Sequence, residues 1–330
     1  MVDDLTKVAK LSELDPFAVG SLVQGRYRIE GIVGRGGMSV VYVARHEALD
    51  RTVVLKVPTT TTTRERQRFL REARAAATIQ HPNVCKVYDY GEHEGIAFLV
   101  MEYLEGRTLL DWMIEEDTLD EVDAVSFVRQ ILSALEAAHG HGFLHRDVKP
   151  ANVILVGEPP KVKLLDFGLA KPLSPRPADP TLTATGVTVG TRPYMAPEQL
   201  SGRRDLDVRC DVYAAGAVLF HMLSGKLPFP GEGVELALAI ASGSHLDLAE
   251  LRPELPRGLV EAVHRALRLQ RQDRFPTAKA FELALARVLP SPEDADTDVI
   301  GDAGMKALIA AAEAKPPRPR RPPPRPARKK

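Results

Sequence analysis

The feature that most constrains the fold is a change in hydrophobic period about one third of the way along the chain. Strand-like, β-branched segments fill residues 26–58, and two more follow at 84–90 and 96–102. One helical segment, residues 64–79, interrupts them and contains no glycine or proline. After Gly106 helical periodicity dominates. Strands followed by helices predict an α+β protein with two lobes rather than an alternating α/β sheet.

The two lobes are expected to differ in size and composition. The first is a small antiparallel sheet with one helix, and the second is larger and mainly helical. Helical segments are predicted at residues 122–139, 212–223, 233–242, 258–269 and 277–288, with short strands near 153–156 and 162–165. A length of 330 residues fits about two domains, or one large domain with tails.

Charge is distributed unevenly along this formally neutral chain. The last sixteen residues, 315–330, hold eight basic residues and no acidic one, so the rest carries 36 basic against 44 acidic residues. Such an acidic body argues against dedicated nucleic-acid binding. Seven prolines within residues 316–330 predict a disordered Pro/Arg-rich tail, preceded by an acidic linker with one short helix at 289–314. Acidic proteins, an anionic membrane surface and polyproline-binding modules are candidate partners of this tail, and a solvated tail without function is the alternative.

Two cysteines, Cys85 and Cys210, are too few for a disulfide framework and have no metal-type spacing. The first residues are acidic and lead into no apolar core, unlike a secretory signal. The longest uncharged apolar run has nine residues, whereas a membrane-spanning helix needs about 20. We therefore expect a cytoplasmic protein.

A glycine-rich segment lies between the first two predicted strands. Glycines at 34, 36 and 37 let the backbone fold over an anion and point N–H groups at it, although such a segment is also typical of an ordinary hairpin. Lys56 follows within an apolar strand, where a buried amine needs a partner. Glu72 could be that partner; the alternative is a surface pair with Arg68 or Arg71.

Three further motifs follow in order. HRDVKPAN occupies residues 145–152, Asp166-Phe167-Gly168 comes fourteen residues later, and Ala196-Pro197-Glu198 comes thirty residues beyond that. Together with the glycine-rich segment and Lys56 they resemble the signature of the protein kinase family. The resemblance covers residues 26–288, with a small lobe at 26–103 and a large lobe at 104–288, and it leaves residues 1–25 as a loose leader. The closest similarity is to bacterial eukaryotic-like Ser/Thr kinases.

The resemblance implies a role for each motif residue. Lys56 would hold the α- and β-phosphates of ATP and be held by Glu72. Asn152 and Asp166 would ligate Mg²⁺ or Mn²⁺, which prefer oxygen ligands. Asp147 would orient the substrate hydroxyl and accept its proton, and Lys149 would steady the γ-phosphate. The nucleotide would contact Val33, Gly34, Arg35, Gly36, Gly37, Met38, Ser39, Val41, Val54, Met101, Glu102 and Leu104, the adenine bonding to the backbone of Glu102 and Leu104.

Other residues would support the site. Glu198 is expected to pair with Arg274, and Asp211 to anchor the catalytic loop. Arg146 before Asp147 marks kinases switched by phosphorylation of the activation loop. Thr183 and Thr185 are the candidate phosphorylation sites, with self-association for phosphorylation in trans; ordinary solvated threonines are the alternative.

Two positions depart from the family pattern. Ser39 replaces the third loop glycine, and Val54 stands where alanine is usual. Neither removes a charge that the chemistry needs. The resemblance thus implies an ATP-dependent Ser/Thr kinase acting on proteins, and the alternative is a catalytically weak nucleotide-binding scaffold that acts through its tail.

Overall fold

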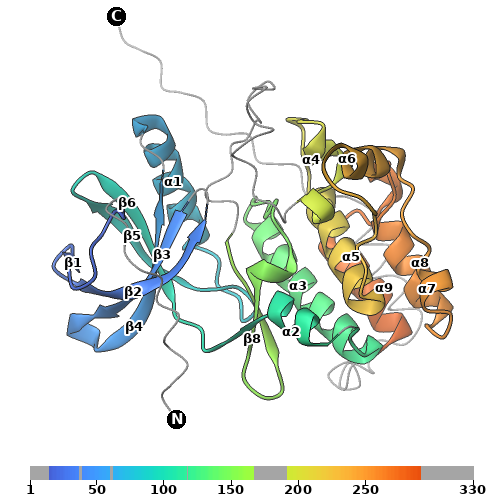
Figure 1. Cartoon of the computed structure of the whole chain (residues 1–330), viewed down its shortest axis with the longest axis horizontal. Coiled ribbons are helices and arrows are strands. Elements are labelled where there is room, and N and C mark those ends of the chain that lie inside the picture. Colours follow the sequence, from blue (N-terminus) through green and yellow to red (C-terminus); the bar gives the residue numbers. More distant parts are fainter. Residues whose placement is uncertain (1–14, 37–38, 60–61, 117, 167–191, 291–330) are drawn as a thin grey trace, which may run out of the picture.

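The computed structural model describes residues 15–36, 39–59, 62–116, 118–166 and 192–290. These residues form two lobes, a sheet with one helix and a larger bundle of helices (Figure 1). The expected α+β arrangement, with a small sheet-containing lobe and a larger mainly helical lobe, is confirmed. The predictions made for Gly37, Met38, Thr183 and Thr185 fall outside the described residues, as do those for the leader at 1–14, the acidic linker with its short helix at 291–314 and the tail at 315–330.

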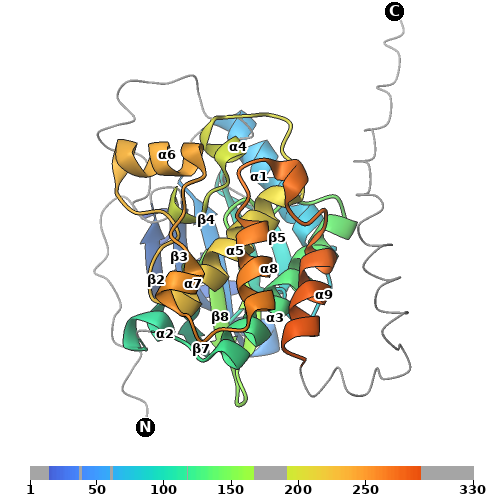
Figure 2. The same cartoon turned by 90° about the vertical axis from the view of Figure 1, so that its right-hand side faces the viewer.

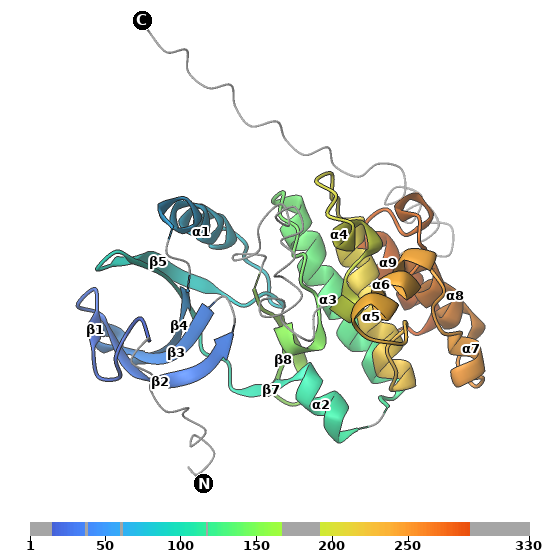
Figure 3. The same cartoon turned by 45° about the horizontal axis from the view of Figure 1, so that its top comes forward.

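The small lobe is built on an antiparallel sheet with strand order β1-β2-β3-β4-β6-β5. Figure 3 shows the sheet curled, with α1 lying along one face. Its elements are β1 (Leu22–Val23), β2 (Tyr27–Gly36), β3 (Ser39–His46), β4 (Arg51–Pro58), α1 (Thr63–Ala76), β5 (Val87–His93) and β6 (Ile96–Glu102), with a 3₁₀ turn at Glu47–Leu49.

Strand register divides the sheet into two faces. Lys56 of β4 is paired with Val41 of β3 and with Leu99 of β6. Directly opposed residues point to the same face, so these side chains share one side of the sheet. Leu99 packs in the cluster that includes Phe69 and Ala73 of α1, which identifies this as the helix-covered side. The helix and the register together bring Lys56 to the inner face of the small lobe.

Residues 15–25 belong to the small lobe, which corrects the expectation of a loose leader. The ring of Phe17 is 5% exposed and lies against Tyr42, with ring centroids 6.0 Å apart. The Gly20 N–H donates to the Ile29 carbonyl at 2.8 Å, and β1 continues this pairing along β2. One aromatic side chain and a short run of backbone hydrogen bonds are enough to fix the segment.

The large lobe is organised around a helix buried on nearly every side, α5. In Figure 2 the helices α3, α8 and α9 gather around it. Its elements are β7 (Gly106–Thr108), α2 (Leu109–Glu115), α3 (Glu121–Gly140), β8 (Val153–Val156), β9 (Lys161–Leu164), α4 (Pro197–Leu200), α5 (Arg209–Ser224), α6 (Gly233–Ser242), α7 (Leu248–Leu251), α8 (Arg257–Ala266) and α9 (Ala278–Val288). Short 3₁₀ turns lie at Pro150–Asn152, Arg192–Tyr194 and Arg271–Asp273.

A small antiparallel sheet, β7-β8-β9, lies where the large lobe meets the small one. It is preceded by the chain crossing between lobes and followed by Leu165 and Asp166. The sheet therefore delivers Asp166 to the boundary between the lobes. In the part of the chain that the structure describes, no helix is long and apolar enough to span a membrane.

Candidate active site

Lys56 is the buried cation of the site. Its side chain is 9% exposed, and Nζ lies 2.5 Å from Oδ2 of Asp166, which comes from the other lobe. A strand lysine with so little water around it requires such an anionic partner. The pair joins β4 to the end of β9 and brings together two residues that the sequence predicted for phosphate and metal binding.

Glu72 does not hold Lys56 in this structure, which corrects the predicted pair. Its Oε1 lies 3.6 Å from Nε of Arg68, one turn earlier on α1, and its Oε2 is buried with no hydrogen-bond partner among the described residues. Burial raises the pKa of Glu72, against the lowering effect of Arg68, Arg146 and Arg71. The alternative pair with Arg68 is the arrangement observed, while Lys56 pairs with Asp166.

Asp147 carries the central carboxylate of the catalytic loop. Its Oδ2 accepts a hydrogen bond from the Asn152 side-chain amide at 3.1 Å and lies 3.2 Å from Nζ of Lys149. The same Asn152 amide donates to the Asp147 carbonyl at 2.8 Å. Since the amide nitrogen is fixed in this way, the Asn152 oxygen is the side-chain atom left to face a ligand. Three of the predicted site residues are therefore neighbours.

His145 connects the catalytic loop to the strand that carries Asp166. Its Nε2 lies 2.6 Å from the Leu165 carbonyl, while its Nδ1 accepts the Asp147 N–H at 3.2 Å. One ring nitrogen must donate and the other accept, which defines a neutral imidazole. The ring is fully buried, and burial lowers the pKa of His145 despite the nearby carboxylates. The sequence argument did not assign this role to His145.

Asp211 anchors the catalytic loop from the start of α5, as the sequence predicted. Its carboxylate accepts the N–H groups of His145 and Arg146, both at 2.8 Å, and lies 2.8 Å from Nε2 of His139. Burial alone would raise the pKa of Asp211, but the bonds from His139 and the loop outweigh it and the pKa is lowered. Arg146 has a positive φ of 63°, a strained conformation for a side-chain residue, which these bonds hold in place.

The side chain of Arg146 adds an unsatisfied donor near the loop. Its Nε is buried without a hydrogen-bond partner among the described residues, and its charge lowers the pKa of Glu72. Gln199 of α4 donates to the Arg146 carbonyl at 3.1 Å. The Arg146 backbone therefore links α4 and α5, while its guanidinium retains donor capacity.

The expected adenine pocket has apolar walls from both lobes. Val54 and Met101 are paired across β4 and β6, and both pack in one cluster with Leu104 and Leu165.

Glu102 makes polar contacts where the chain crosses between the lobes. Its N–H donates to the Lys86 carbonyl, and its side chain accepts from the Lys86 N–H and from Lys163 at 2.9 Å. The Glu102 side chain therefore ties the crossing between the lobes to β9. Leu165 and Lys163 were not predicted, because only the fold brings β9 beneath this crossing.

Residues of the glycine-rich strand lie on different faces of the sheet. Gly34 is paired with Val41, which lies opposite Lys56, so these three residues share one row across the sheet. Val33 is 60% exposed. Arg35 is paired with Val40, which packs on the outer face of the sheet, and its guanidinium binds Asp15. The Arg35 side chain therefore points away from the face that carries Lys56, and the predicted contact of Arg35 with the nucleotide stays a prediction that its backbone, not its guanidinium, would have to fulfil.

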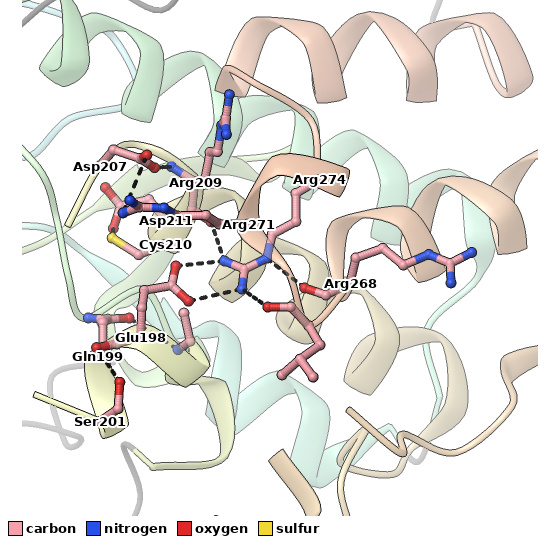
Figure 4. Close-up of polar contacts among 12 residues, drawn as sticks. Glu198, Gln199, Ser201, Asp207, Arg209, Cys210, Asp211, Arg268, Arg271 and Arg274 are labelled. Atoms are coloured by element: carbon pink, nitrogen blue, oxygen red, sulfur yellow. Dashed lines mark hydrogen bonds and ion pairs between the residues drawn. The ribbon is translucent and has the colours of Figure 1, made fainter. Parts of the chain in front are cut away.

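Glu198 and Arg274 form the predicted buried ion pair between α4 and the turn before α9 (Figure 4). Two parallel bonds join them, Nη1 to Oε1 at 2.7 Å and Nη2 to Oε2 at 2.9 Å. The remaining donors of Arg274 bind backbone carbonyls of Arg268, Leu269 and Arg209. Because the Arg274 guanidinium finds an acceptor in Glu198 and in three carbonyls, the pair fixes α4 against the turn before α9.

A glycine-rich hairpin, a strand lysine and a catalytic loop that meet between two such lobes define a protein kinase. Residues 27–282 match the model of the protein kinase domain, and the chain belongs to this family. Serine/threonine-protein kinase pkn3 of Myxococcus xanthus is 37% identical over 302 residues, which is 88% of this chain and 55% of that protein. PrkC of Bacillus subtilis is 35% identical over 268 residues, 80% of this chain and 40% of that protein.

Solved structures agree with this membership. The kinase domain of PknI from Mycobacterium tuberculosis aligns with a TM-score of 0.64 at 29% identity, over 82% of this chain and 99% of that domain. Rad53 residues 1–466, solved in complex with AMP-PNP, aligns with a TM-score of 0.65 at 25% identity, over 78% of this chain and 64% of that one. The chain spans about half the length of the curated relatives described above, 40–55%.

Proposed function

We propose that this chain transfers the γ-phosphoryl group of ATP to serine and threonine hydroxyls of proteins. The observation that carries the proposal is the convergence of Asp147, Lys149 and Asn152 in the large lobe, bonded to the segment that carries Asp166, which in turn pairs with Lys56 of the small lobe. The relatives named serine/threonine-protein kinases support the acceptor class. The complex of Rad53 with an ATP analogue supports the nucleotide.

Asp147 would act on the acceptor hydroxyl. Its Oδ2 is held by Asn152 and Lys149, which restrains the orientation of the carboxylate. A hydroxyl bound there would be aligned for attack and would give up its proton to Asp147. Lys149, next to the same carboxylate, would offset negative charge on the transferring group. Lys56 would exchange part of its contact with Asp166 for the phosphates of ATP.

The residues present suit a divalent cation. Asp166 offers a carboxylate and Asn152 an amide oxygen, the few hard oxygen ligands that Mg²⁺ takes from protein when phosphates and water supply the rest. Bound there, Mg²⁺ would neutralise charge on the phosphates. Asp166 is held at a positive φ of 56°, a strained backbone that is typical of residues fixed for function.

The decisive experiment compares the wild-type chain with Asp147→Asn. Both are incubated with Mg²⁺ and labelled ATP, using a mixed Ser, Thr and Tyr peptide library and the chain itself as acceptors. We expect the label on serine and threonine, and a loss of rate of about 10²–10⁴-fold in Asp147→Asn because the carboxylate that receives the proton is gone.

A matched control is Asp123→Asn, the same change at an exposed aspartate of α3, which should transfer phosphate at the wild-type rate. Thermal unfolding of all three proteins checks that they are equally folded. Equal labelling by wild type and Asp147→Asn would contradict the proposal and favour a nucleotide-binding scaffold. Label on tyrosine alone would contradict the acceptor class.

A further inference from the structure

An ion pair ties the N-terminal segment to the glycine-rich strand. Asp15 and Arg35 interact through two parallel contacts, Nε to Oδ1 at 3.2 Å and Nη2 to Oδ2 at 2.7 Å. The Asp15 side chain is 5% exposed and that of Arg35 is 30% exposed. Only the Asp15 side of the pair is buried, and the bidentate arrangement gives it a more defined geometry than a surface pair with a single contact.

The segment that carries Asp15, residues 15–21, is itself fixed at several points, and we refer to it as the strap. Two residues after Asp15, the Phe17 ring is buried against Tyr42 and His93, and the Phe17 N–H donates to the Tyr42 hydroxyl at 3.2 Å. At the other end, Ser21 accepts the Ile29 N–H at 3.0 Å. The strap therefore holds Asp15 at a set position relative to β2 and β3.

Among the described strands, only β3 pairs with the end of β2. β1 pairs with β2 only at Tyr27 and Arg28, near its beginning. From Gly34 to Gly36 the strand is paired on one side only, with β3. A strand end bonded on one side and rich in glycine is free to bend. Asp15 contacts β2 within this stretch, next to Gly34 and on the face opposite Lys56.

We infer that Asp15 is a positioning residue for the glycine-rich strand and thereby tightens the binding of the nucleotide phosphates. The strap contacts the outer face of β2 through the Arg35 side chain, which leaves the inner face, the one that carries Lys56, to the ligand. Restricting the loop before binding lowers the entropy that binding must remove. The inference rests on the proposed function, since it concerns the same nucleotide.

The test uses Asp15→Asn in the full chain, with a fluorescent ATP analogue as the probe and Mg²⁺ present. We expect the dissociation constant of the analogue and the KM for ATP to rise about three- to tenfold, with kcat at saturating ATP changed less than about twofold. Hydrogen exchange of the peptide spanning residues 27–36 should become faster. The double swap Asp15→Arg with Arg35→Asp should restore part of the affinity.

Glu47→Gln is the matched control, because Glu47 pairs with Arg28 at the other end of the same strand, 2.6 Å away. It should leave KM, affinity and exchange at residues 33–36 unchanged. Unchanged affinity and exchange in Asp15→Asn would overturn the inference, as would an equal effect of Glu47→Gln. If the wild-type chain bound no nucleotide, the proposed function would fail, and the exchange measurement alone would still decide whether the strap restrains the strand.

Discussion

At the scale of single residues, two arginines three positions apart show how burial decides what an ion pair contributes to the stability of the fold. Arg274 has a fully buried side chain that satisfies the Glu198 carboxylate and three backbone carbonyls. Arg271 lies at the surface, 27% exposed, and pairs with Asp205, which is 56% exposed. The first cannot be removed without stranding a buried carboxylate, whereas water can replace the second.

We therefore predict that Arg274→Ala lowers the free energy of unfolding by about 3–5 kcal/mol, because Glu198 is left buried and unpaired. Arg271→Ala should cost less than about 1 kcal/mol. Urea unfolding of the full chain measures both. At temperatures where Arg274→Ala remains folded, its rate of phosphoryl transfer should fall much less than that of Asp147→Asn. Equal stability of the two arginine variants would show that the buried pair does not hold the large lobe together.

The same scale shows where sequence reasoning succeeds and where it ends. The Glu198–Arg274 pair and the Asp211 anchor could be predicted, because the resemblance to the protein kinase family implied both roles and each residue is recognised by its place in a motif. The partner of Lys56 could not be predicted, because the choice between Glu72 and Asp166 depends on how α1 and the end of β9 are placed around the lysine. The direction of Arg35 could not either, because two register shifts in the β2–β3 pairing change which residues face the cleft.

At the scale of elements, α5 organises the large lobe by allowing close approach of its neighbours. Cys210 to Leu223 are buried almost without interruption, which is typical of a helix surrounded by protein. Gly216 sits where α8 crosses: a methyl group on it would lie 2.6 Å from Cβ of Ala266. Small residues on both helices therefore set their separation.

Gly216→Ala should accordingly destabilise the chain by about 1–3 kcal/mol, because the added methyl group forces α5 and α8 apart. The same change at Gly140, near the end of α3, meets no atom within 4 Å and should be neutral or stabilise by up to about 1 kcal/mol. Chemical unfolding distinguishes the two. A stabilising Gly216→Ala would mean that helix propensity outweighs the crowding and that the helices can move apart at little cost.

Element boundaries were predicted well where periodicity was strong. The strand at 96–102 and the helix at 233–242 coincide with β6 and α6, and the others shift by a few residues. The helix α2 and the strand β7 were missed, because both are short and carry too few residues to establish a period. The strap was missed for a related reason: Phe17 alone gives its segment no pattern.

At the scale of the whole molecule, several histidines are built into the fold in the neutral form. Burial lowers the pKa of His145, in the catalytic loop, and of His221, on α5. Burial also lowers the pKa of His81, at the junction of the lobes, and of His264, on α8, where His245 adds to the effect. These four histidines lie in separate regions of the fold. We therefore expect their contributions to the pH dependence of the free energy of unfolding to add.

The sign of that response follows from linkage. A histidine whose pKa is lowered by folding binds a proton more readily in the unfolded chain, so protonation favours unfolding. The stabilisation is complete above the unfolded value of about 6.5 and is lost as the pH falls toward the folded pKa. Carboxylates such as Asp211, whose pKa is also lowered, add their loss only at more acidic pH.

We therefore predict that the free energy of unfolding, measured in urea, falls between pH 7.5 and pH 5.5 with a slope that steepens below about 6.5. Each histidine that stays neutral in the folded chain contributes up to about 1.4 kcal/mol per pH unit. His221→Gln removes one such group and should flatten the slope by up to that amount. Stability that is constant or rises over this interval would contradict the assignment.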